Sequence, residues 1–116
     1  MNLNSIISLF TLFSGETNAK AYIPLINSAI TEVKSKLKAD VNLEDERLSF
    51  LCAAIANLRY TQILSARDKL RYTFAGTVAQ MSNGTQQLDF ANSLVREYWA
   101  SVTELTNDTD FTFVNV

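Results

Sequence analysis

The chain has 116 residues, of which 47% are hydrophobic and 19% are charged, and its formal net charge is −2. This length is sufficient for one domain with a buried core, and these proportions exclude intrinsic disorder as the main state. With only 3 Gly and 1 Pro, the composition also argues against a fold with many turns and predicts a single, mainly helical domain over residues 1–116.

The side-chain inventory excludes several kinds of chemistry. The chain contains no His, which removes the commonest general base, the commonest metal ligand and every Ser-His or Cys-His triad. A zinc site is not expected from a single Cys. The glycine-rich phosphate loops G-x-x-x-x-G-K and G-x-G-x-x-G are also missing from the sequence. We therefore predict a protein that is not an enzyme, without catalytic residues, cofactor or metal.

Three weaker features suit structural roles better than functional ones. Cys52 lies inside the apolar run 50–55, which is typical of a buried hydrophobe rather than a reactive thiol. The adjacent acids 44–46 suit the start of a helix, and Asp108 with Asp110 suit a solvated loop. Because neither acidic group is accompanied by a nucleophile, a base or a phosphate loop, we assign neither a catalytic role.

Charge and hydropathy also limit the expected partners. The basic residues form no continuous stripe, so sequence-specific binding of nucleic acid is not expected. The apolar segment 6–13 is much shorter than the ~20 residues that span a bilayer. No Lys or Arg precedes Lys20, whereas a signal peptide begins with basic residues. We therefore expect no membrane partner and interpret this segment as part of the fold.

Helical periodicity defines the first part of the chain. Apolar residues recur at helical spacing over 3–13, and Gly15 suits a left-handed cap after this short leading helix. A second apolar stripe predicts a helix over 23–37, with Asn18 as a candidate cap. Pro24 favours this start, because proline is tolerated in a first turn and disrupts a helix further in.

The next apolar stripe predicts the central helix of the fold. It runs from Leu43 to about Ser65, after Asn42 as a candidate N-cap and with a first turn rich in acids. Residues 51–56 are apolar nearly all round, so we expect this helix to be the most buried one.

After the central helix the hydrophobic period changes. Tyr72 and Phe74 belong to an alternating run with strand-favouring residues, and Asn83-Gly84 is a strong turn pair. We therefore predict a short β-arm or hairpin over residues 70–81. Its edges would carry unpaired backbone groups, so the arm is expected either to pair with another subunit or to fold back on its own helices.

A last helix is predicted from near Thr85 to about Leu105. Phe90 and Trp99 lie off its apolar stripe, and a wide buried face explains them better than an interface does. An extended apolar tail, residues 111–116, follows and alternates in the manner of a strand. This tail is too apolar for a free terminus, so it is expected either to dock on its own core or to insert into a neighbour.

Three short motifs follow one another along the chain. Residues 22–33 (YIPLINSAITEV) place several apolar positions before an A-x-x-x-V pattern. Residues 75–78 (AGTV) are followed by a polar turn and a helix that ends in Tyr98-Trp99. Residues 108–114 (DTDFTFV) then give an acidic, phenylalanine-rich ending. Together these motifs resemble the small head–tail connector, or adaptor, proteins of tailed phages and prophages, over about residues 18–116.

The resemblance implies a structural role without catalysis. Such connectors assemble as a ring below the portal, extend the DNA channel and dock tail or stopper proteins. It places the protein at the virion head–tail junction, and in the bacterial host cytoplasm during assembly. The leading helix 3–13 has no assigned place in the pattern. The residues expected to contact neighbouring subunits or the portal are Tyr72, Phe74 and Val78 in the arm and Phe111 and Phe113 in the tail.

Two other functions are compatible with the sequence. A small helical interaction or regulatory module, binding one protein partner as a monomer or dimer, would also need no catalytic residues. An enzyme would have to work with carboxylates alone, and two carboxylates that converge in a pocket would indicate one.

Overall fold

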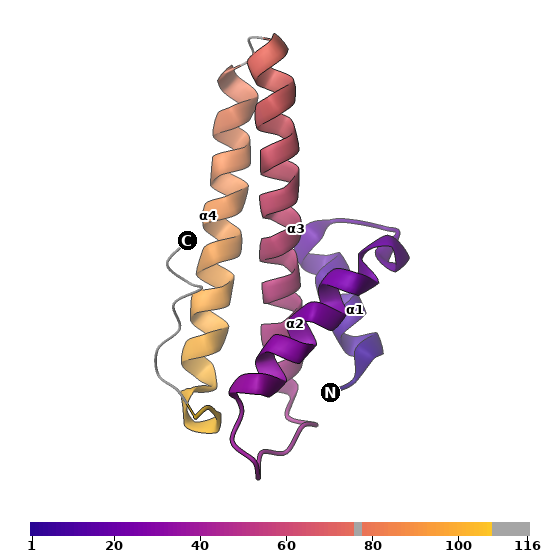
Figure 1. Cartoon of the computed structure of the whole chain (residues 1–116), viewed down its shortest axis with the longest axis vertical. Coiled ribbons are helices and arrows are strands. Elements are labelled where there is room, and N and C mark those ends of the chain that lie inside the picture. The colour runs from indigo at the N-terminus through magenta and orange to yellow at the C-terminus, as the bar shows by residue number, and fades with distance from the viewer. Residues whose placement is uncertain (76–77, 108–116) are drawn as a thin grey trace.

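Helices account for most of the chain in the computed structural model, which describes residues 1–75 and 78–107, and only the backbone of residues 68–75 and 78–85 (Figure 1). The mainly helical fold class is therefore confirmed. The described elements are the α-helices α1 (Leu3–Ser14), α2 (Ile23–Lys36), α3 (Glu46–Ala75) and α4 (Val78–Ser101), with the 3-10 turns η1 (Ala19–Tyr22) and η2 (Thr103–Leu105).

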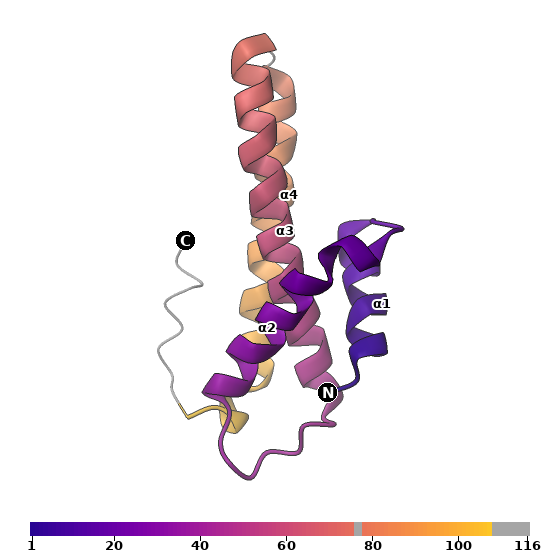
Figure 2. The same ribbon diagram turned by 45° about the vertical axis from the view of Figure 1, so that its right-hand side comes forward.

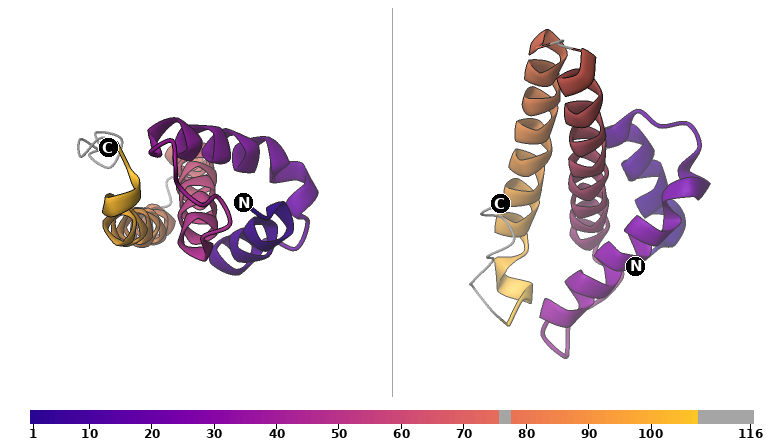
Figure 3. Two further views of the ribbon diagram at one scale, coloured as in Figure 1. Left: turned by 90° about the horizontal axis from the view of Figure 1, so that it is seen from below. Right: turned by 45° about the horizontal axis from the view of Figure 1, so that its top comes forward.

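The two longest helices form the axis of the molecule. α3 and α4 run antiparallel side by side, and α1 and α2 pack against the first half of α3 (Figures 1 and 2). Seen from below, α1 and α2 lie on different sides of α3 (Figure 3). The far half of the α3–α4 hairpin extends beyond both of them (Figure 1).

The leading helix forms as predicted, with a cap at each end. The Asn2 side chain accepts hydrogen bonds from the backbone N–H groups of Asn4 (2.9 Å) and Ser5 (3.3 Å). Gly15 ends the helix with φ 78°, a left-handed conformation that suits glycine, and its N–H donates to the Thr11 carbonyl.

The second helix begins where Pro24 allows it to begin. α2 starts at Ile23, so the proline occupies the first turn and the prediction is confirmed. The predicted cap is wrong in one respect. Asn18 precedes the short turn η1 instead of α2, and its side chain makes no capping hydrogen bond.

The central helix starts later than predicted. Asp45, not Asn42, caps α3, because its Oδ1 accepts a hydrogen bond from the Arg47 backbone N–H at 3.0 Å. Asn42 instead closes a turn before the helix, where its side chain accepts from the Glu44 N–H at 3.0 Å. Both residues can cap, and only the tertiary position of the first turn of α3 decides between them.

The predicted burial of this helix is confirmed. Every residue from Leu51 to Leu58 is buried, because α1, α2 and α4 all pack around that part of α3. The small side chains of Cys52, Ala53, Ala54 and Ala56 permit this close approach from several directions. The neighbouring helices contribute the rest of the core, chiefly Ile6, Phe10, Ile26, Ala29, Val33, Ala91, Val95, Trp99 and Val102.

The predicted β-arm over 70–81 is not confirmed. Residues 70–75 are the end of α3, and α4 begins at Val78, so the described part of this segment is helical. An alternating run this short is ambiguous, because Leu70 and Phe74 are also four residues apart and therefore share a helix face.

The last helix accordingly starts earlier than Thr85. Asn83-Gly84 lies inside α4 and is not a turn. Gly84 in a helix costs about 1 kcal/mol relative to alanine. The backbone hydrogen bonds of α4 and its packing against α3 outweigh this cost. Among the described residues there is no named strand, only an isolated antiparallel bridge between Leu37 and Thr106. The predicted tail, 111–116, lies outside the described residues.

Candidate interaction surfaces

The residues predicted to make subunit or portal contacts fall into two groups. Tyr72 and Phe74 lie near the end of α3 and Val78 begins α4, so the fold brings these three positions to the tip of the hairpin (Figure 1). They gather there on helices and not on a β-arm. Phe111 and Phe113 lie outside the described residues.

A groove opens where α1 ends beside the hairpin. Its volume is about 600 Å³, and three helices line it. α1 contributes Phe13, α3 contributes Tyr60 and Leu64, and α4 contributes Gln87 and Phe90. Polar side chains complete the lining: Ser14, Asn57, Thr61 and Gln86. Phe90 is 56% exposed, which is high for a large aromatic side chain.

Aromatic rings continue this groove towards the base of the hairpin. The ring of Tyr98 lies 6.1 Å from that of Phe13 and 5.4 Å from that of Phe50, measured between centroids. Below them a smaller hollow of about 230 Å³ is lined by Arg47, Phe50, Tyr98 and Ser101, among others. The two hollows share no lining residue and are joined by the ring contact between Phe13 and Tyr98. We call them together the aromatic groove and define it by Phe13, Phe50, Phe90 and Tyr98.

Phe90 and Trp99, which lie off the predicted apolar stripe of the last helix, differ in their burial. Trp99 is 2% exposed, so a wide buried face explains it as predicted, whereas Phe90 is open to solvent. Sequence reasoning did not predict the aromatic groove, although a signal for it exists. Phe90, Leu94 and Tyr98 recur every four residues and form a second apolar line beside the buried stripe of α4.

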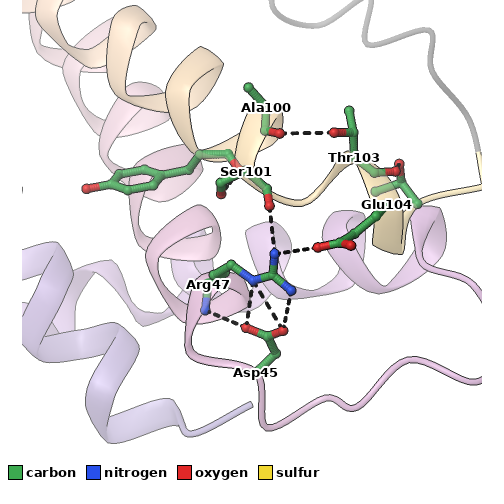
Figure 4. A network of polar contacts seen from close by, with 8 residues as sticks. Asp45, Arg47, Ala100, Ser101, Thr103 and Glu104 are labelled. Carbon is green, nitrogen blue, oxygen red and sulfur yellow. Dashed lines mark hydrogen bonds and ion pairs between the residues drawn. The ribbon is translucent and has the colours of Figure 1, made fainter.

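A polar cluster at the base joins the start of α3 to the end of α4 (Figure 4). The Arg47 guanidinium donates to the Ser101 carbonyl at 2.9 Å, to Glu104 Oε1 at 2.7 Å and to Asp45 Oδ2 at 2.8 Å. The hydrogen bonds from the Arg47 side chain and backbone hold the pKa of Asp45 below its usual value. The arrangement links the start of α3 to the end of α4.

A second polar group lies inside an aromatic cluster. Tyr60 Oη donates to one oxygen of the Glu16 carboxylate at 2.9 Å, and Tyr22 Oη donates to the other at 3.2 Å. The rings of Tyr22 and Tyr60 meet edge to face at 5.0 Å, and Phe10 contacts both. Burial, and then the hydrogen bond to Glu16, raise the pKa of Tyr60. This cluster fixes the loop between α1 and α2 on α3.

The remaining candidates have structural explanations. Cys52 is buried as predicted, and burial raises the pKa of its thiol to about 12, so it stays protonated at neutral pH. The acids 44–46 surround the start of α3 as predicted. Glu44 lies 3.3 Å from the amino group of Met1, and Asp45 pairs with Arg47. Asp108 and Asp110 lie outside the described residues.

One groove does contain two carboxylates. Glu44 and Glu46 line a hollow of about 580 Å³ between α1 and α3, together with Ser5 and Ser8. Both acids are exposed to solvent, and Glu44 is already paired. Acid–base catalysis usually depends on carboxylates whose burial tunes them for the reaction, and this pair lacks that environment.

The described part of the chain contains neither a cluster of metal-ligating residues nor a membrane-spanning helix. Its His, Cys, Asp and Glu residues form no group of three or more that could hold a metal ion. None of its helices is both long and apolar enough to cross a bilayer. Comparisons with protein-family models, curated proteins and solved structures found no match to this chain.

Proposed function

We propose that this chain is a structural head–tail connector subunit of a tailed phage or prophage, which acts by binding and not by catalysis. In this proposal the subunits form a ring below the portal, extend the DNA channel and dock tail or stopper proteins. The order of motifs along the sequence supports this family. The observation that carries a binding role is the aromatic groove, in which Phe90 is exposed and Phe13, Phe50 and Tyr98 are half-buried.

The surface chemistry supports a role in assembly. Exposed aromatic side chains are enriched at protein interfaces, because they bury a large area with little loss of conformational entropy. Phe13 and Tyr98 of the groove pack against the core, so this part of the groove needs no rearrangement to receive a partner. A net charge of −2 with no basic stripe would also let DNA slide past without being held through its phosphates.

The first test is the mass of the protein in solution. Light scattering over a concentration series, with negative-stain images of the most concentrated sample, is expected to reveal closed rings or association that depends on concentration. If the protein stays a monomer alone, it is expected to co-purify with a portal protein. A strict monomer that also ignores the portal would contradict the proposal and favour a small helical interaction or regulatory module.

A truncated chain tests the part played by the tail. Deleting residues 108–116 removes Phe111 and Phe113 but none of the described core. The circular-dichroism spectrum is therefore expected to stay helical while assembly is lost. Normal assembly of the truncated chain would exclude a role for the tail in subunit contacts.

A further inference from the structure

The aromatic groove and the tail have complementary chemistry, and we propose that residues 108–116 of one copy lie in the aromatic groove of a second copy. This inference rests on the proposed function, since it assumes that the subunit assembles with itself. It goes further in naming both sides of the contact. The argument depends on where the tail starts, how far it reaches and where the groove lies.

The root of the tail is fixed at the base of the molecule. The backbone N–H of Asn107 donates to the Lys36 carbonyl at 3.0 Å, and its side-chain amide donates to the Leu37 carbonyl at 3.0 Å. The Lys38 N–H donates to the Leu105 carbonyl at 2.9 Å, next to the bridge between Leu37 and Thr106. Asn107, the last described residue, therefore lies beside the end of α2.

This pairing cannot continue along α2 as a regular antiparallel ladder. Lys36 is the last residue of α2, so the N–H groups of the residues before it are committed to helical hydrogen bonds, and only carbonyls of the last turn remain open. A strand needs both donors and acceptors from its partner, and the residues before Lys36 do not supply both. The alternating sequence of residues 111–116 therefore comes after the last backbone pairing that the structure describes.

The groove lies on another side of the molecule. It is lined by α1, α3 and α4, whereas the tail starts beside α2, and α1 and α2 lie on different sides of α3 (Figure 3). A contact that joins two different surfaces of one subunit is heterologous, and such contacts close into rings when the rotation between copies allows it. Because the two surfaces lie on different sides, a second copy can receive the tail and pass its own tail on to a third.

Length and side-chain spacing also agree. Residues 108–116 reach about 30 Å when extended, whereas the stretch of α4 from Phe90 to Ser101 spans only about 16 Å. The tail is therefore long enough to leave its own subunit and still run along the groove. In an extended chain Phe111 and Phe113 would face the same side, about 7 Å apart. One could then pack on Tyr98 and the other in the adjoining hollow that Phe13 and Phe90 line, since the rings of Phe13 and Tyr98 lie 6.1 Å apart.

A peptide experiment tests the contact directly. The probe is a fluorescently labelled peptide of residues 107–116, and the receptor is the full-length F111S/F113S variant, whose own tail cannot compete. Fluorescence anisotropy is expected to show saturable binding. Adding F90S to the receptor should weaken it about tenfold or more, the usual scale for losing a central aromatic contact. Phe90 is exposed, so this change should not unfold the protein.

The matched control replaces another exposed apolar residue. Leu12 on α1 is 74% exposed and does not line the aromatic groove, so L12S in the same receptor should bind the peptide like the parent. Absence of saturable binding, or equal binding to the F90S receptor, would overturn the proposed contact.

Mixing two full-length variants then distinguishes a second copy from the same chain. F111S/F113S keeps an intact groove and F90S keeps an intact tail, so each alone should be monomeric and their mixture should form 1:1 pairs by sedimentation velocity. A mixture that stays monomeric would overturn docking between copies. Rings that form normally from either variant would overturn this contact but leave the connector function intact. Absence of association in the wild-type protein, even with a portal, would count against both.

Discussion

Glu16 accepts hydrogen bonds from Tyr60 of α3 and from Tyr22 next to α2, so one carboxylate ties three parts of the chain together. Neither phenol could be assigned this role from the sequence. The partners are separated by 44 residues in one case and by six in the other, and only the packing of α1 and α2 on α3 brings them together.

The mutation Y60F tests this link at residue scale. It keeps the ring and removes the hydroxyl, so the free energy of unfolding is expected to fall by about 1.5–3 kcal/mol at pH 7, the usual scale for a hydrogen bond to a charged group. Urea denaturation followed by circular dichroism measures it. Y22F, which removes the longer bond of the pair, should cost less, and an unchanged Y60F would show that water replaces the bond without loss.

Tyr60 also predicts how stability changes at alkaline pH. Its pKa is raised in the folded state, so its contribution is fully present below the unfolded value of about 10 and is lost as the pH rises above that value. Wild-type protein should therefore lose unfolding free energy above about pH 10 more steeply than Y60F. Parallel curves for the two proteins from pH 8 to pH 11 would contradict this assignment.

The lowered pKa of Asp45 predicts how stability changes at acid pH. The hydrogen bonds from Arg47 lower its pKa, so its contribution is present above the unfolded value of about 3.9 and is lost as the pH falls through the lower folded value. D45N keeps a good helix cap but no charge, and should flatten the decline in stability below about pH 4. D40N is the matched control, since Asp40 is exposed and makes no ion pair to the described residues. Its acid profile should follow that of wild type.

At the scale of elements, two glycines distinguish a helical hairpin from the β-arm that the sequence suggested. Gly84 lies inside α4, so G84A is expected to raise the free energy of unfolding by about 1 kcal/mol, the difference in helix propensity between the two residues. If Asn83-Gly84 formed a turn, G84A would instead lower the free energy of unfolding, because alanine is strained at positive φ. Thermal or urea denaturation decides between them.

Gly15 provides the matched control. Its φ of 78° ends α1 in the left-handed region, and a side chain there would meet open space. G15A should therefore destabilise the protein by about 1 kcal/mol through backbone strain alone. Opposite signs for the two glycine-to-alanine changes would support the structure at both positions.

These elements also show how far sequence patterns extend. The stripes over 3–13 and 23–37 and the apolar run 51–56 predicted helices and the buried centre correctly, because a long 3.6-residue period has few alternative structures. The segment 70–81 was assigned to the wrong element, since a short alternating run suits a strand and a helix alike. The cap at Asp45 was missed because several good capping residues occur together before α3.

At the scale of the whole molecule, packing is uneven along the hairpin. Residues 51–58 of α3 are surrounded by three helices, whereas residues 62–67 and 86–90 lie beyond most of α1 and α2 (Figure 1). Amide hydrogen exchange at low protein concentration should therefore be slower in 51–58 by about tenfold or more. Equal protection would mean that another contact covers the outer hairpin. Protection of 86–90 that rises with concentration would identify that contact as association.

The aromatic groove belongs to this scale as well. Each of its helices was predicted at least in part, but the groove exists only because α1 stops at Ser14 while α3 and α4 continue past it. Its lining residues on α3 and α4 all lie within predicted helices, but the sequence patterns did not indicate which helices pack side by side, so they could not place the groove. Surfaces made by several elements depend on tertiary packing, which periodicity does not determine.

The pairing of Leu37 with Thr106 at the base also decides how the subunit would carry a mechanical load. A pull on the chain beyond Asn107 reaches the hydrogen bonds to Lys36 and Leu37 before it reaches the turns of α4. Tension is therefore divided between the ends of two helices, and α4 is not unwound one residue at a time. Whatever is attached to the tail pulls on the body of the subunit and not on a single fraying end.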